Sequence, residues 1–235
     1  MRPTLFLLFV FLFSLPAFAQ VSLGLRASYG YADLRSDASF ENVEDQFNNA
    51  SSLSFGALLE VPVSPVISIR SGAEINRRGT TFTARQLGLV FGATVPNGAE
   101  AKTRFTYVDI PLLIQANIPA GNVVEPYLFA GPTFGFATVG NVRISTNGGN
   151  GSSLMTNDID LDAIDYERFH IAALVGVGVR AKLGDRLTTF LEARYERSFS
   201  DPYQVPLTST TAGYEGVQFG AGFAFILATP AESEE

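Results

Sequence analysis

Apolar side chains fall on every second position of residues 104–118, which read RFTYVDIPLLIQANI. One set of alternate positions is almost wholly apolar, and the other contains Asp109, Gln115 and Asn117. Because successive side chains of a β-strand point to opposite faces, this segment is predicted to be a strand with one apolar face and one mixed face. The segment is longer than the usual strand of about five or six residues. The apolar set comprises Thr106, Val108, Ile110, Leu112, Ile114, Ala116 and Ile118.

The same period of two recurs along the rest of the chain and predicts about eight strands. The facing of one segment stays open, because Gly131 and Pro132 interrupt its alternation. An even number of strands is typical of a bacterial outer-membrane barrel. The other predicted strands are residues 21–34, 52–61, 66–78, 124–138, 169–183, 187–199 and 214–227.

The connections between these segments alternate between short and long. Outer-membrane barrels join their strands by short periplasmic turns and long external loops, with both termini on the periplasmic side. A soluble β-sandwich is not expected to sort its loops in this way. The short turns are residues 62–65, 119–122 and 184–185, and the long loops lie near 35–51, 79–103, 139–168 and 200–213.

The distribution of charge indicates which face of the strands points inward. The apolar faces are nearly free of charge and carry aromatic residues such as Tyr29, Tyr31 and Tyr195 at their outer ends. A soluble barrel has an apolar interior and a polar exterior, whereas a membrane barrel reverses this order. The pattern predicts an all-β, eight-stranded, antiparallel transmembrane β-barrel. The charges of the polar faces are Arg26, Glu60, Arg70, Glu74, Arg78, Asp109, Arg180, Lys182, Glu192, Arg194 and Glu196.

An eight-stranded barrel is only just wide enough to hold its own side chains. The inward charges are therefore expected to pair and block the lumen, and a narrow ion path is the alternative. Proline cannot donate to a strand ladder, so we expect a bulge or a missing hydrogen bond at both Pro111 and Pro132. The predicted structural network of salt bridges comprises Arg26, Glu60, Arg70, Glu74, Asp109, Arg180, Glu192, Arg194 and Glu196.

Composition agrees with an exported barrel. The chain has 235 residues, which suits one domain. Only 17% of the residues are charged, against an average near 25%. The net charge of −7 disfavours nucleic acid as a partner, because phosphate binding needs a basic surface. The absence of Cys does not indicate the cytosol, because a barrel is closed by hydrogen bonds.

Residues 1–19 are predicted to be a signal peptide that is cleaved before Gln20. Arg2 supplies a positive charge, residues 5–15 form an apolar core, and residues 17–19 have the small-x-small pattern of a cleavage site. An uncleaved membrane anchor is the alternative. We expect residues 20–228 to form the barrel domain in the cell outer membrane, after export through the inner membrane. Residues 229–235 are expected to be an acidic, disordered tail.

Two segments resemble a known family. Residues 107–114 (YVDIPLLI) are similar to the Y-x-D-I-P-L-L hallmark of the PorT-type outer-membrane β-barrel domain of Bacteroidetes-type bacteria, and residues 125–132 (EPYLFAGP) to its P-Y-x-x-A-G-P strand. The resemblance extends over about residues 20–227. It implies a small outer-membrane barrel that contains both prolines, and one branch of the family serves a protein-secretion machine. The chain departs from many members by ending in residues 229–235 instead of a final aromatic residue. The motif residues are Tyr107, Asp109, Ile110, Pro111, Tyr127, Gly131 and Pro132.

Candidate chemistry is sparse. His170 is the only histidine, and Ala172 stands two residues further on the same face, so we expect a residue at the rim of the barrel and no catalytic residue. Residues 157–165 resemble the start of a calcium loop, but Ala163 and Phe169 occupy positions that need Gly and an acid. The acidic run is expected to be solvated, with a loose divalent-cation or lipopolysaccharide-bridging site as the alternative. No metal site and no cofactor are predicted.

These observations predict a monomeric, non-enzymatic barrel with a blocked polar lumen and four external loops. Its expected role is structural or adhesive, or support of an envelope assembly connected with secretion. The expected partners are outer-membrane lipid and lipopolysaccharide, together with an envelope or secretion-system protein. A barrel-borne lipid-modifying enzyme and a narrow channel or porin are the two alternatives.

Overall fold

The computed structural model describes residues 21–36, 48–83, 99–120, 123–146, 153–163, 166–199, 203–204 and 211–227. The predicted signal peptide (1–19) and the predicted acidic tail (229–235) lie outside these residues. Among the described residues, no helix is long and apolar enough to cross a membrane.

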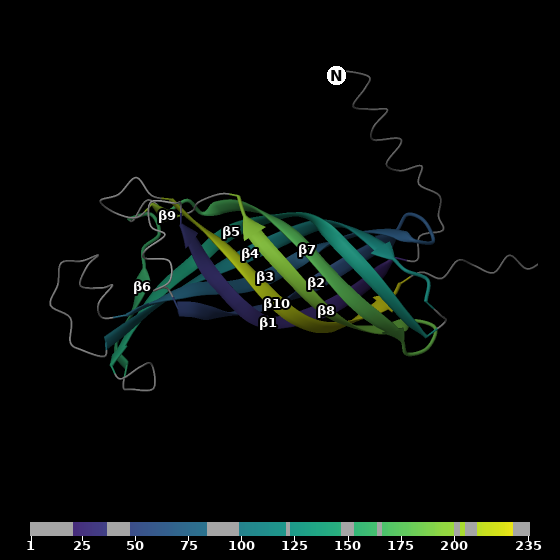
Figure 1. The fold of residues 1–235 in the computed structure, drawn as a ribbon, viewed down its shortest axis with the longest axis horizontal. Helices are drawn as coiled ribbons and strands as arrows, with labels where there is room; N and C mark the ends of the chain where they lie inside the picture. Colours follow the sequence, from purple (N-terminus) through teal and green to yellow (C-terminus); the bar gives the residue numbers. More distant parts are fainter. Residues whose placement is uncertain are drawn as a thin grey trace, which may run out of the picture.

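Eight antiparallel strands form a closed barrel, which confirms the predicted fold (Figure 1). Each wall strand pairs with its neighbours in chain order, and β1 pairs with β10 to close the sheet. Two short strands add to this wall at the end of the barrel with the long connections, which we call the external end after its predicted orientation. β6 (Ser153–Ile159) pairs with β5, and β9 (Tyr203–Gln204) pairs with β10. The wall strands are β1 (Ser22–Ser36), β2 (Asn48–Pro62), β3 (Ile67–Thr83), β4 (Ala99–Asn117), β5 (Val124–Thr146), β7 (Phe169–Lys182), β8 (Leu187–Ser198) and β10 (Thr211–Ile226).

The three short turns lie at one end of the barrel, together with the start of β1 and the end of β10. Leu227 N–H donates to the carbonyl of Val21 at 2.7 Å and ties these two strand ends together. In the turn before β8, Gly184 adopts a φ of 118°, a conformation that glycine reaches without steric cost. The predicted sorting of short turns to one end of the barrel is therefore confirmed.

Each of the four segments that the sequence predicts as long loops contains strand residues, and the extensions are longest in 79–103 and 139–168. β3 continues to Thr83, β4 begins at Ala99, and β5 runs to Thr146 before β6.

The facing of β5, which the sequence left open at Gly131 and Pro132, is regular there: alternate residues from Tyr127 to Ala137 point into the barrel. A β-bulge follows, where Thr106 lies opposite Val139 and Tyr107 opposite Ala137, which leaves Thr138 as an extra residue. The bulge exposes two consecutive residues and shifts the alternation by one position beyond it.

The two prolines interrupt the ladders without shifting their register. Between β3 and β4, pairing stops after Ser71–Leu112 and resumes at Glu74–Asp109, on either side of Pro111. Between β4 and β5, pairing stops after Pro111–Thr133 and resumes at Ile114–Ala130, so Pro132 is skipped. Ser71 Oγ donates to the Pro111 carbonyl at 2.8 Å and satisfies one of the freed acceptors. The expected interruption at each proline is confirmed.

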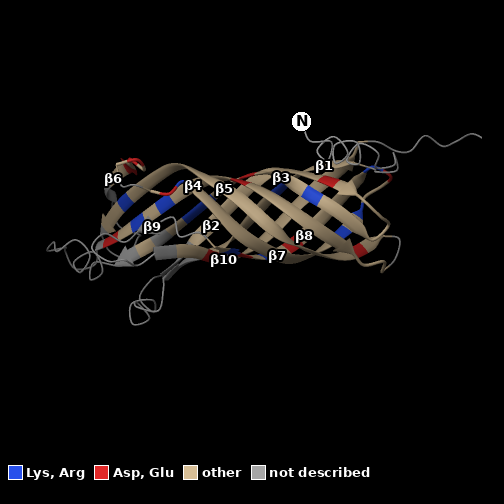
Figure 2. Ribbon diagram, turned by 90° about the horizontal axis from the view of Figure 1, so that it is seen from above, with Lys and Arg blue, Asp and Glu red and all other residues tan. Residues whose placement is uncertain are grey.

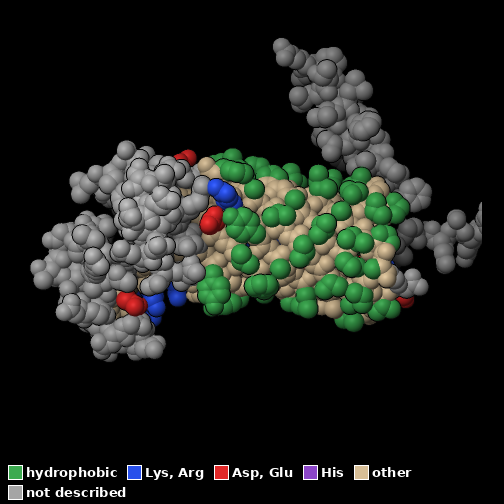
Figure 3. All heavy atoms as spheres, viewed as in Figure 1, with side chains coloured by type: hydrophobic (Ala, Val, Ile, Leu, Met, Phe, Trp, Pro, Cys, Tyr) green, Lys and Arg blue, Asp and Glu red, His purple; other side chains and the backbone are tan. Residues whose placement is uncertain are grey.

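The outer surface of the barrel is covered with apolar side chains, as the face in Figure 3 shows. The buried side chains that point into the barrel are largely polar or charged. Ile114 is 64% exposed on the outer face, whereas Gln115, the next residue, is fully buried. Two of the outward tyrosines, Tyr29 and Tyr31, are more than half exposed. An exterior of this kind is suited to contact with lipid acyl chains.

Inside the barrel, aromatic rings lie against glycines of the neighbouring strand. Tyr127 faces Gly178, and Phe129 faces Gly176, across the β5–β7 ladder. A Cβ atom added at Gly178 would overlap the Tyr127 ring. The glycines therefore provide the room that lets large rings fill a narrow lumen.

Candidate functional site

The lumen holds a charge-balanced network of five arginines and five carboxylates. Each of these charged residues takes part in an ion pair, and each points into the barrel. The nine residues of the predicted network all belong to this set, and Arg78 joins them. The ten are Arg26, Arg70, Arg78, Arg180, Arg194, Glu60, Glu74, Asp109, Glu192 and Glu196.

Near the end with the short turns, Arg180 binds Glu60. The distance from Arg180 Nη2 to Glu60 Oε1 is 3.0 Å, and the same nitrogen donates to Asn117 Oδ1 at 2.8 Å. Lys182 lies beyond them and pairs with Glu125 at the exposed mouth of the barrel. Lys182 was predicted to face the lumen, but its side chain is 47% exposed, because Lys182 is the last residue of β7 and lies at the mouth of the barrel.

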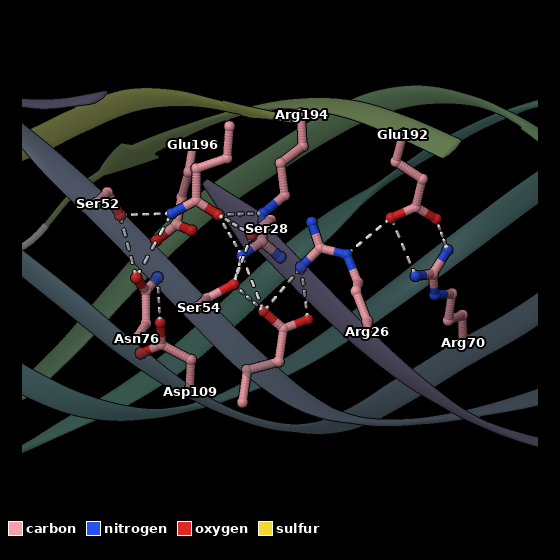
Figure 4. Close-up of polar contacts among 12 residues, drawn as sticks. Arg26, Ser28, Ser52, Ser54, Arg70, Asn76, Asp109, Glu192, Arg194 and Glu196 are labelled. Carbon is pink, nitrogen blue, oxygen red and sulfur yellow. Dashed lines mark hydrogen bonds and ion pairs between the residues drawn. The ribbon is translucent and has the colours of Figure 1, made fainter. Parts of the chain in front are cut away.

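In the middle of the lumen, Glu192 and Glu74 each bind two arginines. Figure 4 shows Glu192 between Arg26 and Arg70. Glu192 accepts hydrogen bonds from Arg26 Nε at 2.8 Å and from the Tyr127 hydroxyl at 2.7 Å, and it also binds Arg70. Arg26 also binds Glu74 at 3.0 Å, and Arg194 binds Glu74 at 2.8 Å. Buried ions need this many partners, because the interior does not solvate an isolated charge.

Neutral side chains continue the network toward the external end. Gln218 Nε2 donates to Ser52 Oγ at 2.6 Å, and Ser52 Oγ donates to Asn76 Oδ1 at 3.2 Å. Asn76 Nδ2 then donates to Asp109 Oδ2 at 3.0 Å. Side chains from four different strands are thereby linked across the barrel, as the close-up shows for Ser52, Asn76 and Asp109 (Figure 4).

Arg78 is the centre of the external half of the lumen. Its Nη2 atom lies 2.5 Å from Asp109 Oδ2 and 2.6 Å from Glu196 Oε1. Its guanidinium also lies 5.1 Å from the centroid of the Tyr107 ring, in cation–π contact.

The expectation that His170 lies at the rim is wrong. The side chain is buried in the lumen, with Nε2 2.8 Å from Arg78 Nη1 and the ring in edge contact with Tyr107. Its position at the start of β7 suggested a strand mouth, but β4 and β5 continue past it and enclose it.

Asp109, His170 and Glu196 are the described residues whose ligand atoms approach one another closely enough for a metal ion, within 4.8 Å. Asp109 Oδ1 and His170 Nδ1 have no hydrogen-bond partner among the described residues. Arg78 lies among the three side chains and already supplies their positive charge. A divalent cation at this place would have to displace the Arg78 guanidinium.

An aromatic cluster covers the external end of the polar network, and the sequence did not reveal it. Phe105 and Tyr166 stack with ring centroids 4.7 Å apart, and the hydroxyls of Tyr107 and Tyr166 are hydrogen-bonded. Tyr166 and Leu161 come from the connection between β6 and β7, which turns back into the barrel. Burial raises the pKa of the Tyr166 hydroxyl, so the group stays neutral. The only sequence signal was that large apolar residues, Leu161 and Tyr166 among them, alternate with the acids of this loop.

Asp160 and Asp162, two acidic residues of that connection, interact with residues of the same connection. Asp160 Oδ1 accepts hydrogen bonds from the backbone N–H groups of Asp162 and Ala163, which forms a turn. Asp162 forms an ion pair with Arg168 at 2.8 Å. Asp165, which completes the predicted acidic run, lies outside the described residues.

The predicted family-motif residues divide between the two faces of the wall. Tyr107, Asp109 and Tyr127 are buried in the lumen. Pro111 is also buried, whereas Ile110 and Pro132 are exposed on the outer face, and Gly131 is half-buried. The motif thus contributes residues both to the lumen network and to the lipid-facing wall.

The spaces between these side chains are small. One cavity of about 20 Å³ lies beside Arg78, Arg194 and Glu196, and another of about 10 Å³ lies beside Glu60, Arg70 and Arg180. A buried water needs about 10–15 Å³, so each of these two cavities has room for little more than one water molecule.

A family model described as "Outer membrane protein beta-barrel domain" matches residues 18–204. No curated protein sequence matches the chain.

Among solved structures, the chain is similar to OprG from Pseudomonas aeruginosa, with 10% identity, a TM-score of 0.47, and coverage of 87% of this chain and 94% of OprG. It is similar to Neisserial surface protein A, with 13% identity, a TM-score of 0.45, and coverage of 87% and 96% respectively. It is also similar to Ail, the attachment invasion locus protein of Yersinia pestis, with 14% identity, a TM-score of 0.41, and coverage of 87% and 99%.

Proposed function

Since this chain belongs to the outer membrane protein beta-barrel domain family, we propose that it is a non-conducting, non-catalytic barrel that supports adhesion or an envelope assembly. In this role the wall anchors the protein in the outer membrane and the external end presents the contact surface. The resemblance of residues 107–114 and 125–132 to the PorT-type domain favours a connection with protein secretion.

The closed lumen carries this proposal. Five arginines and five carboxylates neutralise one another along the barrel axis, and the cluster of Phe105, Tyr107, Tyr166 and Tyr214 covers their external end. An ion crossing the barrel would have to break several buried ion pairs, each of which is costly to separate. A role inside the lumen is therefore less well supported than a role at the surface.

Planar-bilayer recordings test the closed lumen. We expect the purified barrel to give no discrete conductance steps at 100 mV in 1 M KCl, while an open porin in the same lipid conducts. Reproducible steps from the barrel that disappear when the protein is omitted would contradict the proposal.

The burial of His170 supports a non-catalytic role. A lipid substrate outside the barrel cannot contact a side chain enclosed by Arg78, Asp109 and Tyr107. We expect cells that carry His170→Ala to make the same lipid A as cells with the unaltered protein, as measured by mass spectrometry. A change in acylation or phosphorylation caused by this substitution would indicate an enzyme.

Crosslinking in intact envelopes tests the surface role. A photoreactive residue at the exposed Asp162 is expected to capture an envelope protein. The matched residue at Val177, on the lipid-facing wall, is expected to capture no protein. Capture at neither site, or equal capture at both, would contradict a specific external contact.

A further inference from the structure

The outer face of β3, β4 and β5 changes from apolar to basic at the external end. On β3 the outward Ile75 is followed two residues later by Arg77, and on β4 Arg104 and Lys102 lie beyond Val108. On β5 Arg143 lies beyond Val139. Figure 2 shows several Lys and Arg positions at the end of the barrel where β4 and β6 lie, and others toward the opposite end. We call Arg77, Lys102, Arg104 and Arg143 the basic rim.

Strand register brings the basic rim together. Lys102 on β4 pairs directly with Arg143 on β5, and Arg104 stands two residues from Lys102 on the same face. Arg77 on β3 pairs with Thr106, which in turn is two residues from Arg104. Neighbours in this arrangement have Cβ atoms about 5–8 Å apart. The four cations thus form one continuous patch on three adjacent strands.

The charge of the basic rim is poorly compensated within the described part of the chain. Arg77, Arg104 and Arg143 form no ion pair there. Lys102 forms one long ion pair, with its Nζ atom 4.0 Å from Glu100 Oε2. Asp158 on β6 is separated from Arg104 by Asn141 of β5, and it stands diagonal to Arg143, which pairs directly with Thr156 and forms no ion pair with Asp158. Like charges placed directly opposite on neighbouring strands destabilise a sheet, so the Lys102–Arg143 pair favours a bound anion. The outward Arg197, on the other side of the barrel, instead pairs in register with Glu215.

The position of the rim identifies the anion. The apolar wall below it faces the acyl chains, so the four cations face the headgroups of the external leaflet. We propose that the basic rim binds the phosphates of an acylated, phosphorylated glycolipid of that leaflet. Its acyl chains would lie along the outward side chains of Ile75, Val108 and Ile110. The inference needs the outer-membrane location but is independent of whether the lumen conducts.

Native mass spectrometry of the detergent-solubilised barrel tests this site, with bisphosphorylated lipid A as the probe. The triple variant R77Q/R104Q/R143Q is compared with R197Q, which removes an outward arginine away from the rim. Each basic residue at an anionic surface contributes a factor of about five to affinity. We therefore expect the triple variant to bind lipid A roughly a hundredfold more weakly, and R197Q to bind as the unaltered protein does.

Two further measurements distinguish a site for a phosphorylated lipid from a site for any small anion. In the first, lipid A without phosphates is tested on the unaltered barrel, and we expect it to bind as weakly as bisphosphorylated lipid A binds the triple variant. In the second, millimolar inorganic phosphate is added to the complex, and we expect it not to displace bound lipid A. Equal binding of lipid A by the triple variant, equal binding of the dephosphorylated lipid, or displacement by phosphate would each overturn the proposal. The mobility of unheated samples on a gel checks that each variant is folded. If the triple variant does not fold, the single variant R104Q is used instead, and we expect its affinity for lipid A to be about fivefold lower.

Discussion

At the scale of single residues, the lumen is stabilised by how completely its charges are paired. Glu192 has three donors, from Arg26, Arg70 and Tyr127, and Glu74 has two arginines. Buried ion pairs contribute little net stability when they are intact, because desolvation offsets their attraction, but the loss of one partner is costly. Removing one partner of the network is therefore expected to cost more than the intact ion pairs contribute.

Replacing Arg26 by Leu tests this asymmetry. The change removes a donor from both Glu74 and Glu192, so we expect the free energy of unfolding in lipid vesicles to fall by about 3–5 kcal/mol in urea titrations. The control is Lys182→Leu, which breaks the exposed pair with Glu125 and should cost about 1 kcal/mol or less. Equal losses in the two variants would mean that the lumen is hydrated enough to solvate its charges.

Replacing Gly178 by Ala tests the ring-on-glycine packing. The added Cβ atom would overlap the Tyr127 ring, and overpacking of this kind costs about 1–3 kcal/mol. In a Tyr127→Ala background the ring is gone, so the same Gly178→Ala change should cost little. The double-mutant cycle isolates the coupling, and additive losses would show that the ring is not what Gly178 accommodates.

At the scale of strands, the wall follows from alternation along each segment and from the pairing of neighbouring segments. Outward residues are apolar over the length that faces lipid, and they become charged beyond it, as Ile75 and Arg77 on β3 illustrate. The inward charges of these strands find their partners mostly across the lumen, since Glu60 on β2 binds Arg180 on β7 and Glu74 on β3 binds Arg194 on β8. One alternating pattern thus places both the lipid surface and the lumen network.

Replacing Val177 by Arg tests the lipid face. Val177 is 52% exposed in the middle of β7, and an arginine at the bilayer midplane costs about 2–4 kcal/mol. Leu183, just beyond the end of the same strand, is also exposed, and arginine there should cost about 0–1 kcal/mol. Urea unfolding in vesicles measures both, and the same cost at the two depths would contradict the predicted position of the membrane.

Alternation predicted the eight wall strands, their short turns and the inward position of the charged residues, because these features depend on a period that can be read locally. It did not predict the extension of β5 beyond Thr138, because a bulge shifts the period by one residue. It also missed the burial of His170 and the aromatic cover. Both depend on contacts between distant segments, such as that of Tyr166 with Phe105, which leave no periodic signal.

At the scale of the whole molecule, closure is the condition for stability in a membrane. A strand edge in lipid leaves N–H and C=O groups without partners, and each costs several kcal/mol. β10 prevents this by pairing with β8 on one side and with β1 on the other. The closed wall and the charge-balanced lumen together are why we propose that specific contacts are made at the external end.

Truncation at the C-terminus tests closure. A chain that ends at Gly216 loses most of the residues of β10 that pair with β1 and β8, so both of those strands acquire an unpaired edge. We expect it to give no compact, heat-modifiable band on unheated gels and to be degraded by protease in vesicles. A chain that ends at Ala228 keeps Ile226 and the Leu227–Val21 hydrogen bond and should behave as the full chain does. If removing residues 229–235 abolished folding as completely as removing residues 217–235, the signal for assembly would lie in the tail, and pairing of β10 would not be sufficient to close the barrel.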